Sequence, residues 1–166
     1  MKIFRAMQLF AFLSLVFLLS GCVGGDTANK RTSNRAQNSN ANASPAKDDV
    51  EEFTKLVNLF VTPEEVVWRE TETQNGKKLI AVLNYSPQDA QTIVAQAEKY
   101  RPALSGELDA EDWFPPELIA KSQESGDEIL KGKNYGANDF FSESYKNGKI
   151  TRIEGTDYFV LELSNQ

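Results

Sequence analysis

The alternation of apolar and polar positions predicts a β-hairpin near the middle of the chain. Residues 66–73 and 77–85 flank Asn75-Gly76, a dipeptide that accepts positive φ angles at both centres of a type I′ turn. A turn centred there pairs Trp68 with Leu83 across the two strands. The second strand contains LIAVL, which is apolar on both faces, so we expect it in the interior of a sheet.

Two more strands are predicted near the end of the sequence. The segments KITRI (149–153) and YFVLEL (158–163) are rich in β-branched and aromatic residues and lie on either side of Gly155. In the second segment the alternate residues Phe159, Leu161 and Leu163 share one face. They are therefore expected to point into the core.

Apolar residues at helical spacing predict a helix before the hairpin and a second one after it. In the first, Asp48 is the expected N-cap with Glu51 three positions on, the apolar stripe covers residues 50–61, and Pro63 closes the helix. The second starts with Ser86 as cap and Pro87 at the first helical position. Its expected buried stripe, up to the end at Arg101-Pro102, is Ala90, Ile93, Val94, Ala97 and Tyr100.

A shorter helix is predicted from Pro116 to about Gln123, ending near Gly126. Residues 127–145 show no clear pattern. The elements together predict an acidic globular α+β domain over residues 48–166, in which two or three helices pack on an antiparallel sheet of four or five strands. Its 119 residues are an ordinary size for a single domain.

The first 21 residues have the layout of a secretory signal peptide. Lys2 and Arg5 precede an apolar run of 14 residues from Ala6 to Leu19. A membrane-spanning helix needs roughly 20 apolar residues. We therefore expect residues 1–21 to be a cleaved signal.

Leu19-Ser20-Gly21-Cys22 resembles the lipobox of bacterial lipoproteins, in which a leucine and two small residues precede a cysteine. The resemblance implies that the Cys22 thiol receives a diacylglyceryl group, that the signal is cut before Cys22, and that the new amino terminus is acylated, for example with palmitate. Cys22 is the only cysteine, and an anchoring role explains a thiol without a disulfide partner. Because Val23 rather than aspartate follows it, the resemblance favours the outer membrane in cells with two membranes, with the domain facing the periplasm or the exterior.

Residues 22–47 contain no aromatic side chain and are dominated by Asn, Ala, Ser, Gly and Thr, so they are predicted to form a disordered tether. Residues 23–47 have four basic and one acidic side chain, a net charge of +3. Residues 48–166 have 12 basic and 23 acidic side chains, a net charge of −11. An acidic domain is repelled by anionic headgroups and phosphates, so it is expected to stand off the membrane and not to bind nucleic acid.

The composition excludes several kinds of enzyme. The chain has no histidine, which removes Ser-His-Asp and Cys-His triads and histidine-bearing zinc sites. It has no glycine-rich phosphate loop of standard spacing. No cofactor is expected, and any catalysis would rest on carboxylates, lysines, tyrosines or serines.

A few acidic and aromatic residues are candidates for a ligand site. These are Asp109, Glu111, Asp112, Trp113, Asp139 and Tyr145. Paired carboxylates would suit a glycosidase and an oxygen cluster would suit calcium, but solvated loop charges give the same pattern. Trp113, and the aromatic residues around Tyr145, have two interpretations: a sugar or peptide platform, or part of the core.

The sequence thus predicts a bacterial envelope lipoprotein held at the membrane by its lipid. Its acidic domain is expected to bind or bridge envelope components, either a protein or a glycan, without catalysis. One alternative is a carboxylate-based hydrolase acting on envelope carbohydrate. Another is an inhibitor or accessory subunit of an envelope complex.

Overall fold

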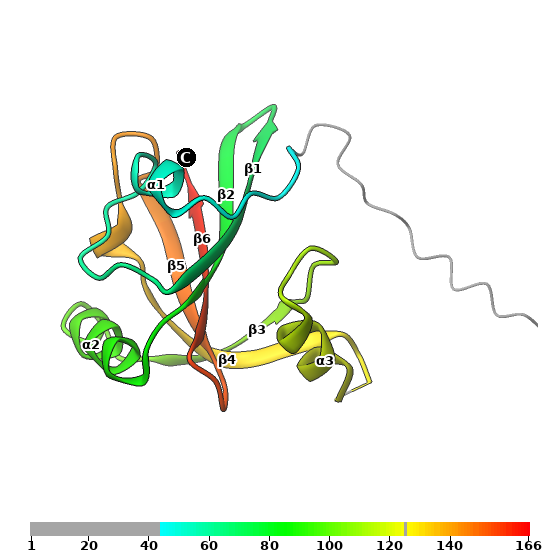
Figure 1. Ribbon diagram of the computed structural model, residues 1–166. Helices are drawn as coiled ribbons and strands as arrows, with labels where there is room; N and C mark the ends of the chain where they lie inside the picture. Colours follow the sequence, from blue (N-terminus) through cyan, green and yellow to red (C-terminus); the bar gives the residue numbers. More distant parts are fainter. Residues whose placement is uncertain (1–43, 125) are drawn as a thin grey trace, which may run out of the picture. The chain divides into compact units, whose positions relative to one another are not determined.

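The computed structural model describes residues 44–124 and 126–166 (Figure 1). The predicted signal peptide, Cys22 and most of the predicted tether lie outside these ranges. The described residues form three α-helices and a six-stranded sheet, so the predicted α+β class is confirmed with one or two strands more than expected. The elements are α1 (Val50–Thr54), β1 (Glu65–Thr73), β2 (Gly76–Asn84), α2 (Pro87–Ala97), β3 (Leu104–Asp109), α3 (Pro116–Glu124), β4 (Ile129–Gly136), a short 3₁₀ helix η1 (Asn138–Phe140), β5 (Asn147–Ile153) and β6 (Tyr158–Ser164).

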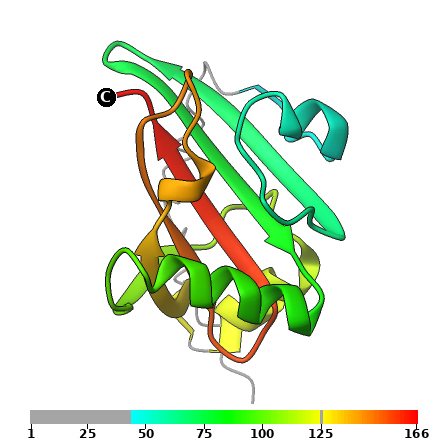
Figure 2. The same cartoon turned by 90° about the vertical axis from the view of Figure 1, so that its left-hand side faces the viewer.

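All neighbouring strands are antiparallel, in the order β1-β2-β6-β5-β4-β3. As predicted, the LIAVL strand lies inside the sheet, between β1 and β6. Alternate residues of each strand point to opposite faces. The α2 face of the sheet is covered by α1, α2 and η1, and α3 lies on the other side, which we call the α3 face (Figures 1 and 2).

The larger core lies on the α2 face. The predicted residues Phe159, Leu161 and Leu163 all point into it and are buried. Trp68 is 1% exposed and packs against Phe53 of α1, with 6.1 Å between the ring centroids. Tyr85 packs edge-on against Phe159 at 5.6 Å. This core joins both helices and η1 to the central strands.

A smaller core lies on the α3 face. Phe114 and Leu118 pack there onto buried residues of four strands, namely Val82, Leu130, Ile153 and Val160. In Figure 1, α3 lies alongside β4, whereas no described helix lies on that side of β1 and β2 near their hairpin turn. One part of the α3 face is therefore covered by a helix and another part is not.

The hairpin is present, but its predicted register is wrong by two residues. Trp68 pairs with Ala81, and Thr73 pairs with Gly76, so Gln74 and Asn75 form the turn. The side chain of Asn165 accepts a hydrogen bond from the Lys77 amide at 2.8 Å and lies where a Cβ on Gly76 would be. This contact favours glycine, with its φ of 127°, at the start of β2 rather than in the turn. Because the shift is even, every side chain keeps its predicted face.

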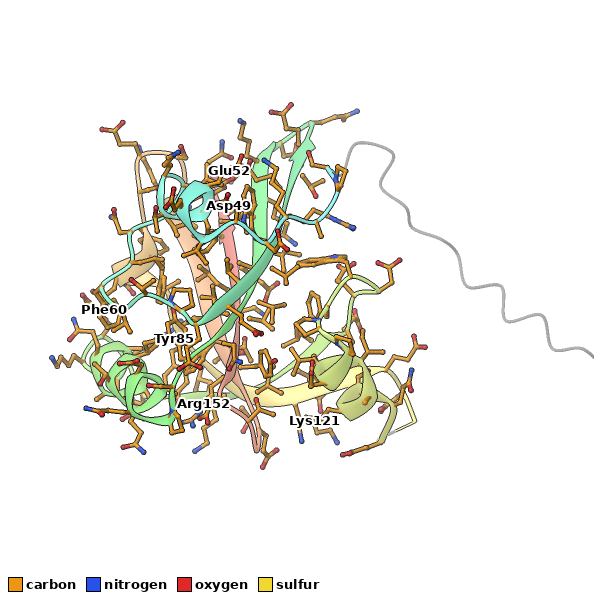
Figure 3. The ribbon with its side chains drawn as sticks, viewed as in Figure 1. Asp49, Glu52, Phe60, Tyr85, Lys121 and Arg152 are labelled. Atoms are coloured by element: carbon orange, nitrogen blue, oxygen red, sulfur yellow. The ribbon has the colours of Figure 1, made fainter. Side chains whose placement is uncertain are left out.

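The first helix is much shorter than predicted. It begins after Asp49, not Asp48. The Asp49 carboxylate accepts a hydrogen bond from the Glu52 amide at 2.7 Å (Figure 3). The helix has five residues because the chain that follows is bound to the end of η1 and to the segment after it. There the Asn58 amide donates to the Phe140 carbonyl, its side chain donates to the Phe141 carbonyl, and the Ser142 hydroxyl donates to the Leu56 carbonyl at 2.7 Å. Tertiary contacts therefore override the helical apolar pattern.

The other two helices start as predicted, but α2 ends at Ala97, before the predicted end at Arg101-Pro102, and Val94 of its expected buried stripe is half-buried. The Ser86 hydroxyl caps α2 by accepting a hydrogen bond from the Asp89 amide at 3.2 Å, and Pro87 is the first helical residue. Ala90, Ile93 and Ala97 are buried. Tyr100, predicted to be buried, is 50% exposed because the helix ends at Ala97. The third helix starts at Pro116 as predicted.

Strands β3 and β4 were not predicted. Their sequences, LSGELD and ILKGKNYG, combine glycines with polar residues, which masks the period of two. Gly132 is required by packing, since a Cβ there would lie 2.2 Å from the Arg152 carbonyl oxygen of β5. The pairing of β4 with β5 thus requires glycine at position 132, although glycine in a sequence argues against a strand.

Candidate binding site on the open sheet face

The sequence-predicted candidates do not form one site. Asp109 is the last residue of β3, Glu111, Asp112 and Trp113 lie in the connection from β3 to α3, and the three acids are exposed. Trp113 is half-buried. It packs edge-on against Phe114 at 4.8 Å, and the Arg69 guanidinium lies 5.1 Å from the centre of its ring. The Trp113 ring is therefore engaged by its own chain.

Asp139 and Tyr145 lie on the α2 face, where both hold elements together. Asp139 accepts a hydrogen bond from the Tyr100 hydroxyl at 2.6 Å, which joins η1 to the end of α2 and raises the pKa of Tyr100. Tyr145 is fully buried and its hydroxyl donates to the carboxylate of Glu70. Burial, followed by this hydrogen bond, raises the pKa of Tyr145 above its ordinary value. These contacts are structural.

The same residues do not assemble a metal site. Within residues 44–124 and 126–166, no group of three or more Asp, Glu, His or Cys side chains is placed to hold a metal ion.

A different surface gathers polar side chains on the uncovered part of the α3 face. Strand register aligns two rows across the sheet. One row contains Arg69, Ile80, Glu162 and Lys149, from β1, β2, β6 and β5 in turn. The next contains Thr71, Lys78 and Ser164. We call these seven residues the open sheet face.

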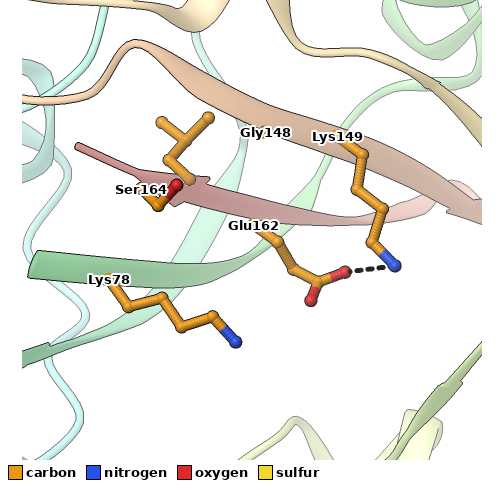
Figure 4. Close-up of a pocket in the computed structure, with 6 residues that line it drawn as sticks. Lys78, Gly148, Lys149, Glu162 and Ser164 are labelled. Carbon is orange, nitrogen blue, oxygen red and sulfur yellow. Dashed lines mark ion pairs between the residues drawn. The ribbon is translucent and has the colours of Figure 1, made fainter. Parts of the chain in front are cut away.

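The open sheet face contains a shallow hollow of about 360 Å³ (Figure 4). It is lined by Lys78, Gly148, Lys149, Glu162, Leu163 and Ser164. The side chain of Lys78 comes from β2 and those of Glu162 and Ser164 from β6. These strands lie in the middle of the sheet, so the rigid ladder fixes the spacing of the polar groups.

Positive charge dominates this surface. Lys149 is paired with Glu162, with 2.8 Å between Nζ and Oε2. Arg69 and Lys78 have no ion pair with any described residue, and the buried Nε of Arg69 has no hydrogen-bond partner there. Three cations and one carboxylate give a net charge of +2, in contrast to −11 for residues 48–166.

This arrangement suits binding better than catalysis. The hollow has a single carboxylate, Glu162, and that group is already neutralised by Lys149. Glycoside hydrolysis needs two carboxyl groups about 5–10 Å apart. The free donors of Arg69 and Lys78 can instead bind anionic groups, since both side chains are long, cationic and rich in N–H.

Sequence reasoning missed this surface because no single segment contains it. Glu162 interrupts the otherwise apolar run of β6, and that interruption is the local signal, whereas Lys78 belongs to the polar start of β2. The signal becomes a site only when the register of β1, β2, β6 and β5 and the position of α3 are known.

None of the helices within the described ranges is long and apolar enough to cross a membrane. No family model, no curated protein and no solved structure matches this chain.

Proposed function

We propose that this chain is a lipid-anchored protein of the bacterial cell envelope whose domain binds a ligand with anionic groups on the open sheet face, without catalysis. The observation that carries the binding role is the excess of positive charge around Arg69, Lys78 and Lys149 in an otherwise acidic domain. The anchoring role rests on the lipobox resemblance of residues 19–22.

Charge distribution supports a directed binding mode. A ligand that carries carboxylates is repelled by most of a domain with 23 acidic and 12 basic side chains. The same ligand is attracted to the open sheet face, where the net charge is positive. Complementary charge therefore orients the ligand on the open sheet face and increases its association rate.

The setting follows from the anchor. A chain acylated at Cys22 is retained at a membrane, and two or more fatty chains make that retention stable. With Val23 after the cysteine, we place the protein in the outer membrane of cells that have two membranes. Its ligand is then a component of the envelope, either a glycan or a protein with exposed carboxylates.

The binding role is tested by titrating the processed chain, with Cys22→Ser to keep it soluble, against two carboxylate probes. Oligogalacturonate represents an acidic glycan, hexaglutamate represents an acidic peptide, and a neutral dextran oligomer is the control. We expect one or both acidic probes to shift the amide resonances of β2, β5 and β6 in NMR spectra. If neither acidic probe shifts them, the proposal is wrong.

Lys78→Glu is expected to weaken binding of the acidic probe by about tenfold or more, because it replaces an unpaired cation with an anion at the hollow. Lys55→Glu, an equal charge change at the end of α1, is the matched control and should have a much smaller effect. Calorimetric titration at constant ionic strength measures both. Equal losses in the two variants would show that net charge, and not the open sheet face, governs binding.

A further inference from the structure

The two edges of the sheet differ in whether their backbone is covered. At the β1 edge, the chain before α1 pairs with the strand: the Lys47 amide donates to the Trp68 carbonyl and the Trp68 amide donates to the Lys47 carbonyl, each at 2.8 Å. The Ser44 amide also donates to the Glu70 carbonyl at 3.3 Å. At the β3 edge, no backbone segment of the described chain makes such bonds.

The hydrogen-bond pattern identifies the unpaired groups of β3. Its register with β4 continues to Ala110, whose amide donates to the Glu128 carbonyl at 3.0 Å. In an antiparallel pair, alternate residues direct both backbone groups toward the partner strand. The even-numbered residues of β3 therefore bond to β4. Ser105, Glu107 and Asp109 direct their N–H and C=O groups outward, and no backbone partner for them lies within residues 44–124 or 126–166.

This edge lacks the features that commonly prevent another strand from pairing with an edge strand. Strand β3 pairs with β4 at six consecutive positions without a bulge and contains neither proline nor lysine. Leu104 is 60% exposed at its start. An incoming strand can thus form a regular ladder with β3.

The side chains of β3 select the charge of that strand. Glu107 and Asp109 are exposed on the α2 face. Two copies joined through β3 would bring the acids of both chains onto one face, where they repel. A second copy of this chain is therefore disfavoured as the partner.

A basic strand fits instead. On the α2 face, Glu107 is the register partner of Lys131, and the Glu154 amide donates to the Lys131 carbonyl. The row Glu154–Lys131–Glu107 alternates in charge, and a cation on the next strand continues it. On the α3 face, exposed Leu104 and half-buried Leu108, which packs against the smaller core, favour apolar neighbours.

We propose that β3 accepts an extended peptide segment of a partner protein, with basic residues on the α2 face and apolar residues on the α3 face. The peptide adds a seventh strand to the sheet beyond β3. This site goes beyond the anionic ligand proposed above, because it lies on a strand outside the open sheet face and selects the opposite charge.

The test uses the processed chain with Cys22→Ser and two probe hexapeptides, one alternating lysine with valine and the other alternating glutamate with valine. The basic peptide is expected to bind, to shift the amide resonances of Ser105, Glu107 and Asp109, and to slow their hydrogen exchange. A basic peptide methylated on alternate backbone nitrogens should bind at least about tenfold more weakly, because it cannot complete the ladder. Equal shifts of the β3 amides by the basic and acidic peptides, shifts by the basic peptide confined to other strands, or no binding of the basic peptide would overturn the proposal.

Two variants locate the binding on β3. Glu107→Lys is expected to weaken binding of the basic peptide by about tenfold and to strengthen binding of the acidic one. Glu143→Lys, in the exposed segment after η1, should change neither affinity. Ser105→Pro removes an outward N–H without removing a bond to β4 and should abolish binding. The NMR spectrum of the Ser105→Pro variant away from β3 reports whether that variant is folded. If it is unfolded, the effect of Glu107→Lys on peptide affinity still tests whether the peptide binds to β3. An unchanged affinity in Glu107→Lys, or dimerisation of the unsubstituted chain through β3, would contradict the assignment of a basic partner.

Discussion

Replacing Trp68 by alanine is expected to lower the free energy of unfolding by about 3–5 kcal/mol, the range for a fully buried large aromatic residue. Trp68 is 1% exposed, packs against Phe53, and lies under Lys47, whose Nζ is 4.7 Å from the ring centre. Its removal leaves a cavity where α1, β1 and the covered edge of the sheet meet. Urea denaturation followed by circular dichroism measures the loss.

Trp113→Ala is the matched control, since it removes the same side chain from a half-buried position on the α3 face. The Trp113 variant keeps Phe114 as the buried aromatic residue of that core, so its loss of stability should be less than half that of Trp68→Ala. Equal losses in the two variants would contradict the division of the fold into a larger and a smaller core.

Cys22→Ser is expected either to release the protein from the membrane fraction or to leave it as an uncleaved precursor that keeps the apolar run of residues 6–19. The change removes the proposed site of lipid attachment, and a chain without acyl groups loses about 0.8 kcal/mol of membrane affinity for each methylene that is no longer buried. Fractionation of cells that express the two forms measures the release, and metabolic labelling with palmitate measures the modification. Ser20→Ala, a small-for-small change within the lipobox, is the control and should leave both unchanged.

A Cys22→Ser protein that stays in the membrane fraction in processed form would contradict the anchor. Absence of palmitate from the mature unsubstituted chain would contradict it as well. Neither result bears on the open sheet face, because the two parts of the proposed function rest on separate observations.

The local predictions succeeded where short-range chemistry decides the structure. The α2 cap at Ser86-Pro87 depends on one side chain and a fixed φ angle, and the two-sided apolar strand needs an interior position in any sheet. They failed where distant contacts decide. The turn of the hairpin was displaced by Asn165, and the first helix was shortened by the bonds of Asn58 to the end of η1 and to the segment after it.

The candidate site was the least predictable feature. Sequence reasoning selected acidic and aromatic clusters, yet Tyr145 is buried against Glu70, and Trp113 is engaged by Arg69. The open sheet face depends on the register of four strands and on how far α3 reaches. Neither property has a signal in a single segment of the chain.

We propose that the open sheet face is where this chain binds its ligand. This proposal is tested most directly by placing a benzophenone side chain at Thr71, on the open sheet face, or at Gln91, on the exposed side of α2, in the full-length chain within intact cells. After irradiation, we expect adducts of higher mass from the Thr71 position in the membrane fraction and few from Gln91. Adducts from Gln91 with none from Thr71 would contradict it.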